Sequence, residues 1–340
     1  ADIDRGGVFA ATIGTYHLLT PAERRLLAGF IINKFRGDQS LFTEGTKIIE
    51  KRTGRRVVGV LPYLRDLALP QEDSVALDRK LEQPQEVTGK IRIGVIRLPH
   101  ISNYTDFDPL ELEPGVALTY ITPPADLRPF DLLIIPGTKN TIADLLYLQQ
   151  TGLARQIQDF ARQGGRIVGI CGGYQIMGDW VRDPAGVESP MAELRGLGLL
   201  PIETIMATEK TTTLVEADFL GLPTETPTVS GYEIHMGQSK AHGPGQPVFI
   251  IRRQLDREVN LWDGWATPDF RLWGTYIHGL FDSDGFRRAF LKHLAAARQG
   301  CLEVSSFNFA SFLEEQFDRL AAVARMHLDL AYIYKLIGKD

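Results

Sequence analysis

The chain has few of the residues and segments that mark secreted, metal-binding or membrane proteins. Only two of its 340 residues are cysteine, Cys171 and Cys301, and they lie far apart in the sequence. This number and spacing argue against a disulfide framework and a cysteine-based zinc site. They fit a reducing compartment, so we expect a cytoplasmic protein with no structural metal. We also expect neither a signal peptide nor membrane association, because no apolar run approaches the roughly 20 residues that a membrane span needs.

The chain also lacks an excess of positive charge and a phosphate-binding loop. Its formal net charge is −5 at pH 7, so we expect no nucleic-acid partner. No Gly-x-x-x-x-Gly-Lys-Ser/Thr segment occurs. The first residue is Ala1, which falls inside what reads as the end of a strand. We therefore interpret the chain as truncated at its N-terminus, and we expect the phosphate loop of any ATP site to precede it.

The most informative segment of the sequence is residues 166–178. It reads as a short apolar strand that leads through a glycine-rich turn into the start of a helix. Gly169 and Gly173 are the small residues that a sharp turn needs on both sides of a nucleophile, here Cys171. Amides at the start of the helix would favour the thiolate, and the amide of Gly172 could meet a developing oxyanion. A buried structural cysteine fits the same pattern, so this segment alone leaves both interpretations open.

Residues 1–80 have the strand–helix–strand alternation of an α/β domain with parallel strands. Ligands of such sheets lie beyond the carboxyl ends of the strands. Asp2 and Asp4 are therefore candidates for Mg²⁺ or substrate binding, and Asn33 and Lys34 for nucleotide binding. The alternatives are helix capping for Asp2 and Asp4 and an ordinary polar loop for Asn33 and Lys34. We expect a linker at residues 81–90.

Residues 91–300 form the second expected domain, followed by a C-terminal helical segment at 301–340. Gly137 follows an apolar strand and could contribute an amide to an oxyanion hole, although an ordinary turn before a helix is the alternative. Glu233 and His235 alternate along a strand and share one face, as in a site lining or a solvated face. His278 ends a strand at a glycine turn, where a general base would be placed; a structural histidine is the alternative.

Together, the Pro136-Gly137-Thr138 loop, the Cys171 turn and the strand with His278 resemble a class I glutamine amidotransferase. Residues 231–237 and 276–281 resemble its cobyrinic/cobyric acid type. Three segments outside that domain resemble the cobyric acid synthase family, which has a dethiobiotin-synthetase-like domain. They are residues 2–9, 29–38 and 315–321. The resemblance covers nearly the whole chain. It implies an α/β fold: a partial P-loop-type parallel-sheet domain, then a flavodoxin-like amidotransferase domain with a Cys nucleophile elbow, and C-terminal helices.

The resemblance also implies a chemistry. Cys171 would attack the side-chain amide of glutamine, His278 would act as general acid and base, and Gly137 and Gly172 would bind the oxyanion. The ammonia would amidate the b, d, e and g carboxylates of a corrinoid, adenosylcobyrinic acid a,c-diamide, activated by ATP with Mg²⁺, in cobalamin biosynthesis. Cobyrinic acid a,c-diamide synthase, a related amidotransferase–ligase, a thiol hydrolase and a non-catalytic binding module with this fold are the alternatives.

One position departs from the wider amidotransferase pattern. Many class I members carry Glu two residues after the histidine, and here that position is Leu280. The cobyric type is expected to work with a Cys–His pair, which leaves open what orients the imidazole of His278. We expect Glu233 to do so, with His235 beside it in the site lining.

Overall fold

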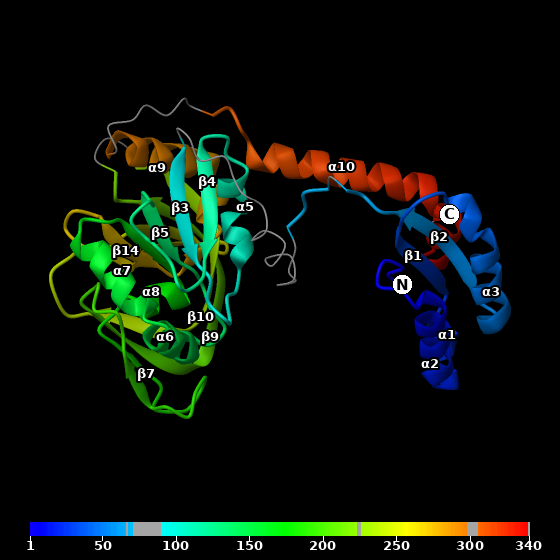
Figure 1. Ribbon diagram of the computed structural model, residues 1–340, viewed down its shortest axis with the longest axis horizontal. Coiled ribbons are helices and arrows are strands. Elements are labelled where there is room, and N and C mark those ends of the chain that lie inside the picture. The colour runs from blue at the N-terminus through cyan, green and yellow to red at the C-terminus, as the bar shows by residue number, and fades with distance from the viewer. Residues whose placement is uncertain (66, 71–89, 223–225, 298–304, 339–340) are drawn as a thin grey trace. The chain divides into compact units, whose positions relative to one another are not determined.

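The computed structural model describes residues 1–65, 67–70, 90–222, 226–297 and 305–338. The chain divides into two compact units (Figure 1), of which unit 1 is Ala1–Leu69 with Ala310–Asp340 and unit 2 is Pro70–Phe309. The expected linker at 81–90 lies outside the described residues except for Lys90. The C-terminal helices, which we expected as a segment of their own, fall into the same unit as the first 69 residues.

Unit 1 is built around the parallel strands β1 (Gly29–Phe35) and β2 (Arg56–Pro62). Its helices are α1 (Val8–Leu18), α2 (Pro21–Leu26), α3 (Thr43–Thr53), α10 (Phe309–His327, which begins one residue before this unit) and α11 (Leu330–Leu336). The C-terminal part is attached by polar contacts to both strands. Arg56 forms an ion pair of 2.9 Å with Asp329, and the hydroxyl of Tyr332 donates to the carbonyl of Ala28, just before β1.

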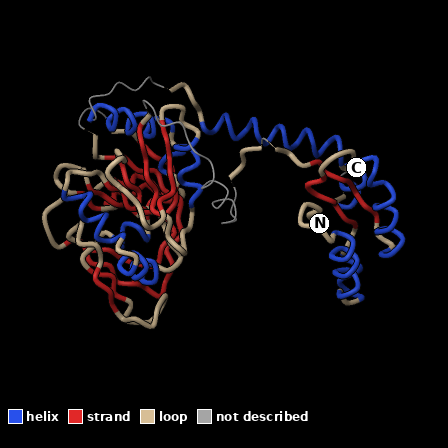
Figure 2. The backbone as a smooth tube through the Cα atoms, viewed as in Figure 1, coloured by secondary structure: helices blue, strands red, loops and turns tan. Residues whose placement is uncertain are grey.

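The core of unit 2 is a mostly parallel sheet, one of the groups of strands drawn in red in Figure 2. Its strand order is β13-β14-β6-β5-β3-β4. Its parallel strands are β3 (Ile91–Ile96), β4 (Val116–Ile121), β5 (Leu132–Ile135), β6 (Ile167–Ile170) and β14 (Leu272–Thr275), and the short edge strand β13 (Trp265–Ala266) runs antiparallel. Every residue of β5, β6 and β14 is buried. Runs of apolar residues without alternation are typical of parallel strands that are covered on both faces.

Helices of unit 2 follow the parallel strands in the chain. They are α5 (Asp108–Glu111), α6 (Thr141–Gln150), α7 (Leu153–Arg162), α8 (Gly172–Ile176) and α9 (Asp284–Ala297), with 3₁₀ turns η2 (Tyr104–Phe107) and η3 (Leu280–Asp282). In the part of the chain that the structure describes, no helix combines the length and the apolar character needed to cross a bilayer. The mixed α/β class with parallel sheets, expected from the sequence, is confirmed.

A second, largely antiparallel sheet accompanies the first in unit 2. Its strands are β7 (Trp180–Arg182), β8 (Glu193–Arg195), β9 (Ile202–Phe219), β10 (Thr228–Ala241), β11 (Phe249–Gln254), β12 (Arg257–Asp263) and β15 (Ile277–His278). The chain leaves the first sheet at β14 and enters the second at β15 after a single residue, Tyr276. The two sheets therefore meet at His278.

The turn between β6 and α8 leaves no room for larger side chains. A Cβ added to Gly173 would lie 1.9 Å from the carbonyl oxygen of Ile135. We expect Gly173→Ala to lower the free energy of unfolding by at least about 1–3 kcal/mol, because the obstacle is backbone that must shift.

Gly285→Ala is the matched control for thermal and denaturant unfolding. This glycine also lies in a helix, α9, and an added Cβ there meets nothing within 4 Å. Alanine is the better helix former, so Gly285→Ala should leave stability unchanged or slightly raised. Equal stability of the two variants would contradict the close packing at Gly173.

Candidate active site

Cys171 lies at a strained turn between the last residue of β6 and the first residue of α8. Its backbone angles are φ 51° and ψ −110°, an unusual conformation for a residue with a side chain. Such conformations persist where the surrounding structure fixes them, and they gather at functional sites. Here the surroundings are tight, since a Cβ on Gly169 would lie 2.8 Å from the backbone nitrogen of Tyr174. The turn therefore holds the thiol in one place at the carboxyl end of β6.

The thiol of Cys171 faces a cavity of about 290 Å³. Its Sγ donates to the carbonyl oxygen of Ile234 on β10 at 3.5 Å. Polar and charged residues line the cavity together with the cysteine: Ser102, Asn103, Thr138, Lys139, Thr141, Gln175, Glu188, Lys210 and His235. The nucleophilic group is thus beside a polar cavity large enough for a small ligand.

His278 is buried, and one edge of its ring is fixed by a carboxylate. Its Nδ1 lies 2.6 Å from Oδ2 of Asp106, and the other oxygen of Asp106 accepts the backbone N–H of Gly279. Burial disfavours the charged imidazolium, but Asp106 and then Cys171 favour it more strongly, and the pKa of His278 is raised to about 10. Among the described residues, Nε2 has no hydrogen-bond partner. This second nitrogen is therefore available to the thiol or to a ligand.

A stacked tyrosine fixes the face of the same imidazole. The rings of Tyr232 and His278 are stacked, with centroids 5.2 Å apart and planes 16° apart. Asn103 donates to the Tyr232 hydroxyl at 2.6 Å, and burial raises the pKa of Tyr232 to about 12. The phenol thus stays neutral at physiological pH, and the histidine ring is restrained on an edge and on a face.

The loop after β5 lies between His278 and the cysteine turn. A Cβ on Gly137 would lie 3.0 Å from Cε1 of His278. A Cβ on Gly172 would lie 2.6 Å from the methyl group of Thr138 and 3.1 Å from its backbone nitrogen. The structure therefore brings Gly137, Gly172, Cys171 and His278 to one place.

The sequence that forms this site is also similar to the sequences of known proteins. Residues 92–286 match the CobB/CobQ-like glutamine amidotransferase domain. The chain is 46% identical over 346 residues to a cobyric acid synthase of Syntrophobacter fumaroxidans, covering 99% of this chain and 67% of that protein. A cobyric acid synthase of Moorella thermoacetica is 45% identical over 346 residues, at 100% and 66% coverage. The chain belongs to the cobyric acid synthase family. It spans about two thirds of the length of these relatives.

The expectation that Glu233 orients the imidazole is wrong. In the antiparallel pairing of β10 with β15, Tyr232 is opposite His278, and Glu233 is opposite Ile277. Cross-strand partners share a face and successive residues alternate, so Glu233 points away from the histidine ring. Its carboxylate accepts instead from Gln254 at 3.4 Å, and burial together with Asp263 raises the pKa of Glu233 to about 7.

His235 lies on the same side of β10 as Glu233 and also lines the cavity beside Cys171. Its Nε2 is 3.9 Å from the Glu233 carboxylate, and its ring stacks on Tyr276 with centroids 3.8 Å apart. Burial lowers the pKa of His235, which favours a neutral ring at physiological pH. The functional role that we expected for His235 in the site lining stays a prediction.

Sequence reasoning missed Asp106, the residue that holds the imidazole. Asp106 lies in η2, in the segment between β3 and β4, to which we assigned no function. A usable signal was present, because η2 follows the carboxyl end of a parallel strand, where functional groups of such sheets gather. The sequence spacing alone did not reveal that this loop, which follows β3, would contact β15 near the end of unit 2.

The residues predicted for nucleotide, Mg²⁺ or substrate binding also lie together, in unit 1. Asp2 forms a parallel bridge with Asn33, and its carboxylate accepts from Lys34 at 2.9 Å. The carboxylate of Asp4 pairs with Arg36. Both carboxylates are thus neutralised by basic side chains, and the described residues hold no group of three or more metal-ligating side chains. This arrangement does not fit a protein-held Mg²⁺ site, and we derive no step through one.

The contact between Asp106 and His278 predicts a pH-dependent reactivity of Cys171. In Asp106→Asn the pKa of His278 falls, so the imidazolium that stabilises a neighbouring thiolate is lost near neutral pH. We expect alkylation of Cys171 by iodoacetamide to slow about tenfold or more at pH 7, since each unit of pKa corresponds to roughly a tenfold change. The difference should vanish above about pH 10, where His278 is neutral in both proteins.

The rates are measured at the Cys171 peptide by mass spectrometry, which separates it from Cys301. Glu233→Gln is the matched control, because it removes a carboxylate from the opposite face of β10 and should leave the profile unchanged. Identical pH profiles for the wild type and Asp106→Asn would show that the carboxylate does not set the charge of the imidazole.

Proposed function

We propose that unit 2 hydrolyses the side-chain amide of glutamine, and that the ammonia serves the amide-forming reaction of the cobyric acid synthase family. The observation that carries this proposal is the placement of Cys171. Its thiol lies at a strained turn beside a polar cavity, next to a histidine whose Nδ1 is fixed by Asp106 and whose Nε2 is free. A purely structural cysteine would need neither the cavity nor the oriented base.

In the proposed mechanism the proton of the thiol resides on Nε2 of His278, which makes the ring an imidazolium, and the sulfur of Cys171 attacks the amide carbon of glutamine as the thiolate. The amides of Gly137 and Gly172 bind the oxyanion of the tetrahedral intermediate. His278 returns its proton to the leaving nitrogen, and ammonia departs from a glutamyl thioester. A water molecule, deprotonated by the same nitrogen, releases glutamate and restores the thiol. Asp106 accepts the hydrogen bond of Nδ1 throughout and keeps the imidazole oriented toward the sulfur.

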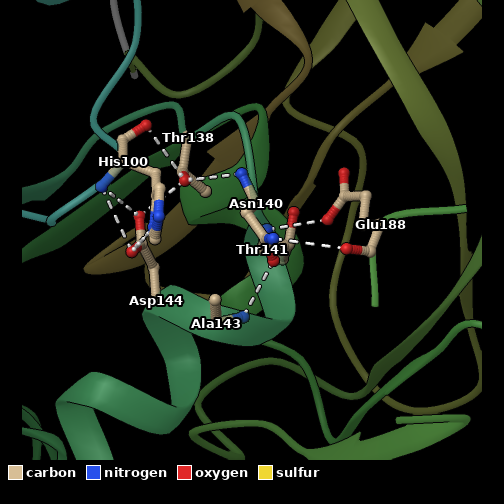
Figure 3. A network of polar contacts seen from close by, with 7 residues as sticks. All are labelled: His100, Thr138, Asn140, Thr141, Ala143, Asp144 and Glu188. Carbon is tan, nitrogen blue, oxygen red and sulfur yellow. Dashed lines mark hydrogen bonds and ion pairs between the residues drawn. The ribbon is translucent and has the colours of Figure 1, made fainter. Parts of the chain in front are cut away.

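The charges that line the cavity support an amino acid as the substrate. Glu188 supplies a carboxylate, and Lys139 and Lys210 supply cations, around the same space as Cys171. The Glu188 carboxylate accepts the backbone N–H of Thr141 at 2.7 Å (Figure 3). Burial raises the pKa of Glu188, so a cation bound beside it would stabilise its charged form. We assign Glu188 to the α-ammonium of glutamine and the lysines to its α-carboxylate.

Family membership supports the second half of the reaction. A carboxylate reacts poorly with ammonia because its oxyanion is a poor electrophile and a poor leaving group, so amide formation needs ATP to activate it. We propose that unit 1 contributes to that step, with Asp2, Asn33 and Lys34 near the nucleotide or the acceptor. The acceptor that we propose is adenosylcobyrinic acid a,c-diamide, amidated at its b, d, e and g carboxylates. The relatives that support this are named cobyric acid synthases.

Covalent labelling tests the glutamine site. A diazo-ketone analogue of glutamine should form a stoichiometric adduct on Cys171, because it offers the α-amino acid group and an electrophile in place of the amide. The adduct is located by peptide mass spectrometry. His278→Ala should label at least tenfold more slowly, since general acid–base groups contribute about 10²–10⁴-fold to rates.

Excess glutamine is the control, since it should protect Cys171 from the analogue. A folded protein that gives no adduct, or an adduct that glutamine does not prevent, would contradict a glutamine pocket. It would favour the non-catalytic binding module.

The assignment of Glu188 makes a separate prediction. Glu188→Gln should raise the KM for glutamine about 10- to 100-fold, because a hydrogen bond to a charged group contributes about 1.5–3 kcal/mol. Alkylation of Cys171 by iodoacetamide, which has no ammonium group, should be unchanged. Glu209→Gln is the matched control, since this exposed carboxylate is next to Lys210 but outside the cavity lining. A lower kcat at unchanged KM would contradict a binding role for Glu188.

The corrinoid acceptor is tested with the whole gene product, ¹⁵N-amide glutamine, ATP and Mg²⁺. We expect ¹⁵N to enter cobyrinic acid a,c-diamide and not cobyrinic acid. Labelling of cobyrinic acid would instead identify an a,c-diamide synthase.

A further inference from the structure

Two loops at the carboxyl edge of the parallel sheet are joined to each other. One follows β3 and leads to Asp106, and the other follows β5 and contains Gly137. Ser102 N–H donates to the Gly137 carbonyl at 2.9 Å, and Lys139 N–H donates to the His100 carbonyl at 3.0 Å. The loop that leads to the partner of the imidazole is thus bonded directly to the loop beside Cys171.

A fully buried carboxylate, Asp144 in the first turn of α6, holds both loops (Figure 3). From the first loop it accepts the backbone N–H of His100 at 3.2 Å and contacts His100 Nδ1 at 2.7 Å. From the second loop it accepts the hydroxyl of Thr138 at 2.6 Å. That hydroxyl in turn accepts the backbone N–H of Asn140. The charge of Asp144 is therefore satisfied only when both loops are in place.

These contacts fix the orientation of the peptide between Gly137 and Thr138. Its carbonyl is held by Ser102, and in a trans peptide the N–H of Thr138 points the opposite way. That nitrogen lies close to Gly172, as a Cβ there would be 3.1 Å from it. Thr138 therefore joins two contacts: its side chain is bonded to Asp144, and its backbone packs beside the cysteine turn. A displacement of the side chain would move the backbone next to Gly172, whose amide we propose binds the oxyanion.

We infer that Asp144 is a positioning residue: through His100 and Thr138 it keeps the Gly137 loop in the geometry needed to stabilise an oxyanion. The inference rests on the proposed amidase function and adds the group that sets its geometry. Displacing a reacting or stabilising group by about 1 Å can cost roughly 10²-fold in rate. Asp144 does not line the cavity and is bonded to Thr138, so it acts on the steps that form an oxyanion and not by contact with the substrate.

Two reactions of the same sulfur distinguish this role from a general structural one. Attack on glutamine develops an oxyanion, whereas displacement of iodide from iodoacetamide develops none there. We expect Asp144→Asn and Thr138→Val to lower kcat for glutamine hydrolysis about 10²-fold, with KM little changed. Their rates of alkylation at Cys171 should stay within about twofold of the wild type. Parallel loss of both rates, or loss of neither, would overturn the inference.

Conservative variants supply the rescue and the control. Thr138→Ser keeps the hydroxyl that donates to Asp144, and His100→Asn keeps a donor near the position of Nδ1, so both should retain most of the hydrolysis rate. His242→Asn changes another His–Asp pair, with 2.9 Å between His242 and Asp179, and should leave both rates unchanged. Equal damage by Thr138→Ser and Thr138→Val would show that the hydroxyl contact is not what matters.

Hydrogen exchange tests the same inference without any activity. Asp144→Asn and Thr138→Val should speed amide exchange in residues 97–108 and 136–141 together, because each variant releases the contact that joins the loops. Faster exchange confined to α6 would overturn the inference. If the wild type hydrolyses no glutamine at all, the proposed function fails, and this measurement still decides whether Asp144 couples the two loops.

Discussion

The hydrogen bond between Asp106 and His278 is the contact on which the rest of the site depends. It joins a loop that follows β3 to a strand near the end of unit 2, at 2.6 Å and out of contact with solvent. A buried imidazole without a partner would lose its proton and could rotate about its side-chain bonds. With the carboxylate on Nδ1, the ring keeps one tautomer and presents Nε2 to the thiol. The proposed activation of Cys171 thus depends on tertiary structure and not on the glycine-rich turn alone.

The direction in which His278 faces is set by a very short strand. β15 contains two residues, and its pairing with β10 places Tyr232 opposite His278 and Glu233 opposite Ile277. A slip of one residue would exchange these faces and turn the histidine away from the cysteine. The stacked Tyr232 ring and the Asp106 carboxylate oppose such a slip, since both interact with the histidine in one register only.

Local pattern predicted the parts of the site that lie within one strand–turn–helix unit. The turn at Cys171 and the glycine after β5 could be identified because their constraints come from neighbouring residues. Asp106 and Asp144 could not. Asp144 meets His100 because β5 lies beside β3, and Asp106 meets His278 on β15, which is 172 residues further along the chain. Alternation correctly placed Glu233 and His235 on one face, but alternation does not say which face meets the histidine. In the same way, the sequence predicted a C-terminal helical segment without identifying β1 and β2 as part of the same unit.

The burial of Asp144 is linked to the positions of the two loops beside the site, because these loops supply its hydrogen-bond donors. A carboxylate with no exposure is tolerated only if donors replace the lost water, and here these donors are His100 and Thr138, aided by the start of α6. Separation of the loops would remove these donors from the carboxylate. Contacts formed on folding therefore hold the Gly137 loop, for which we propose a role in oxyanion binding, without a contribution from substrate binding.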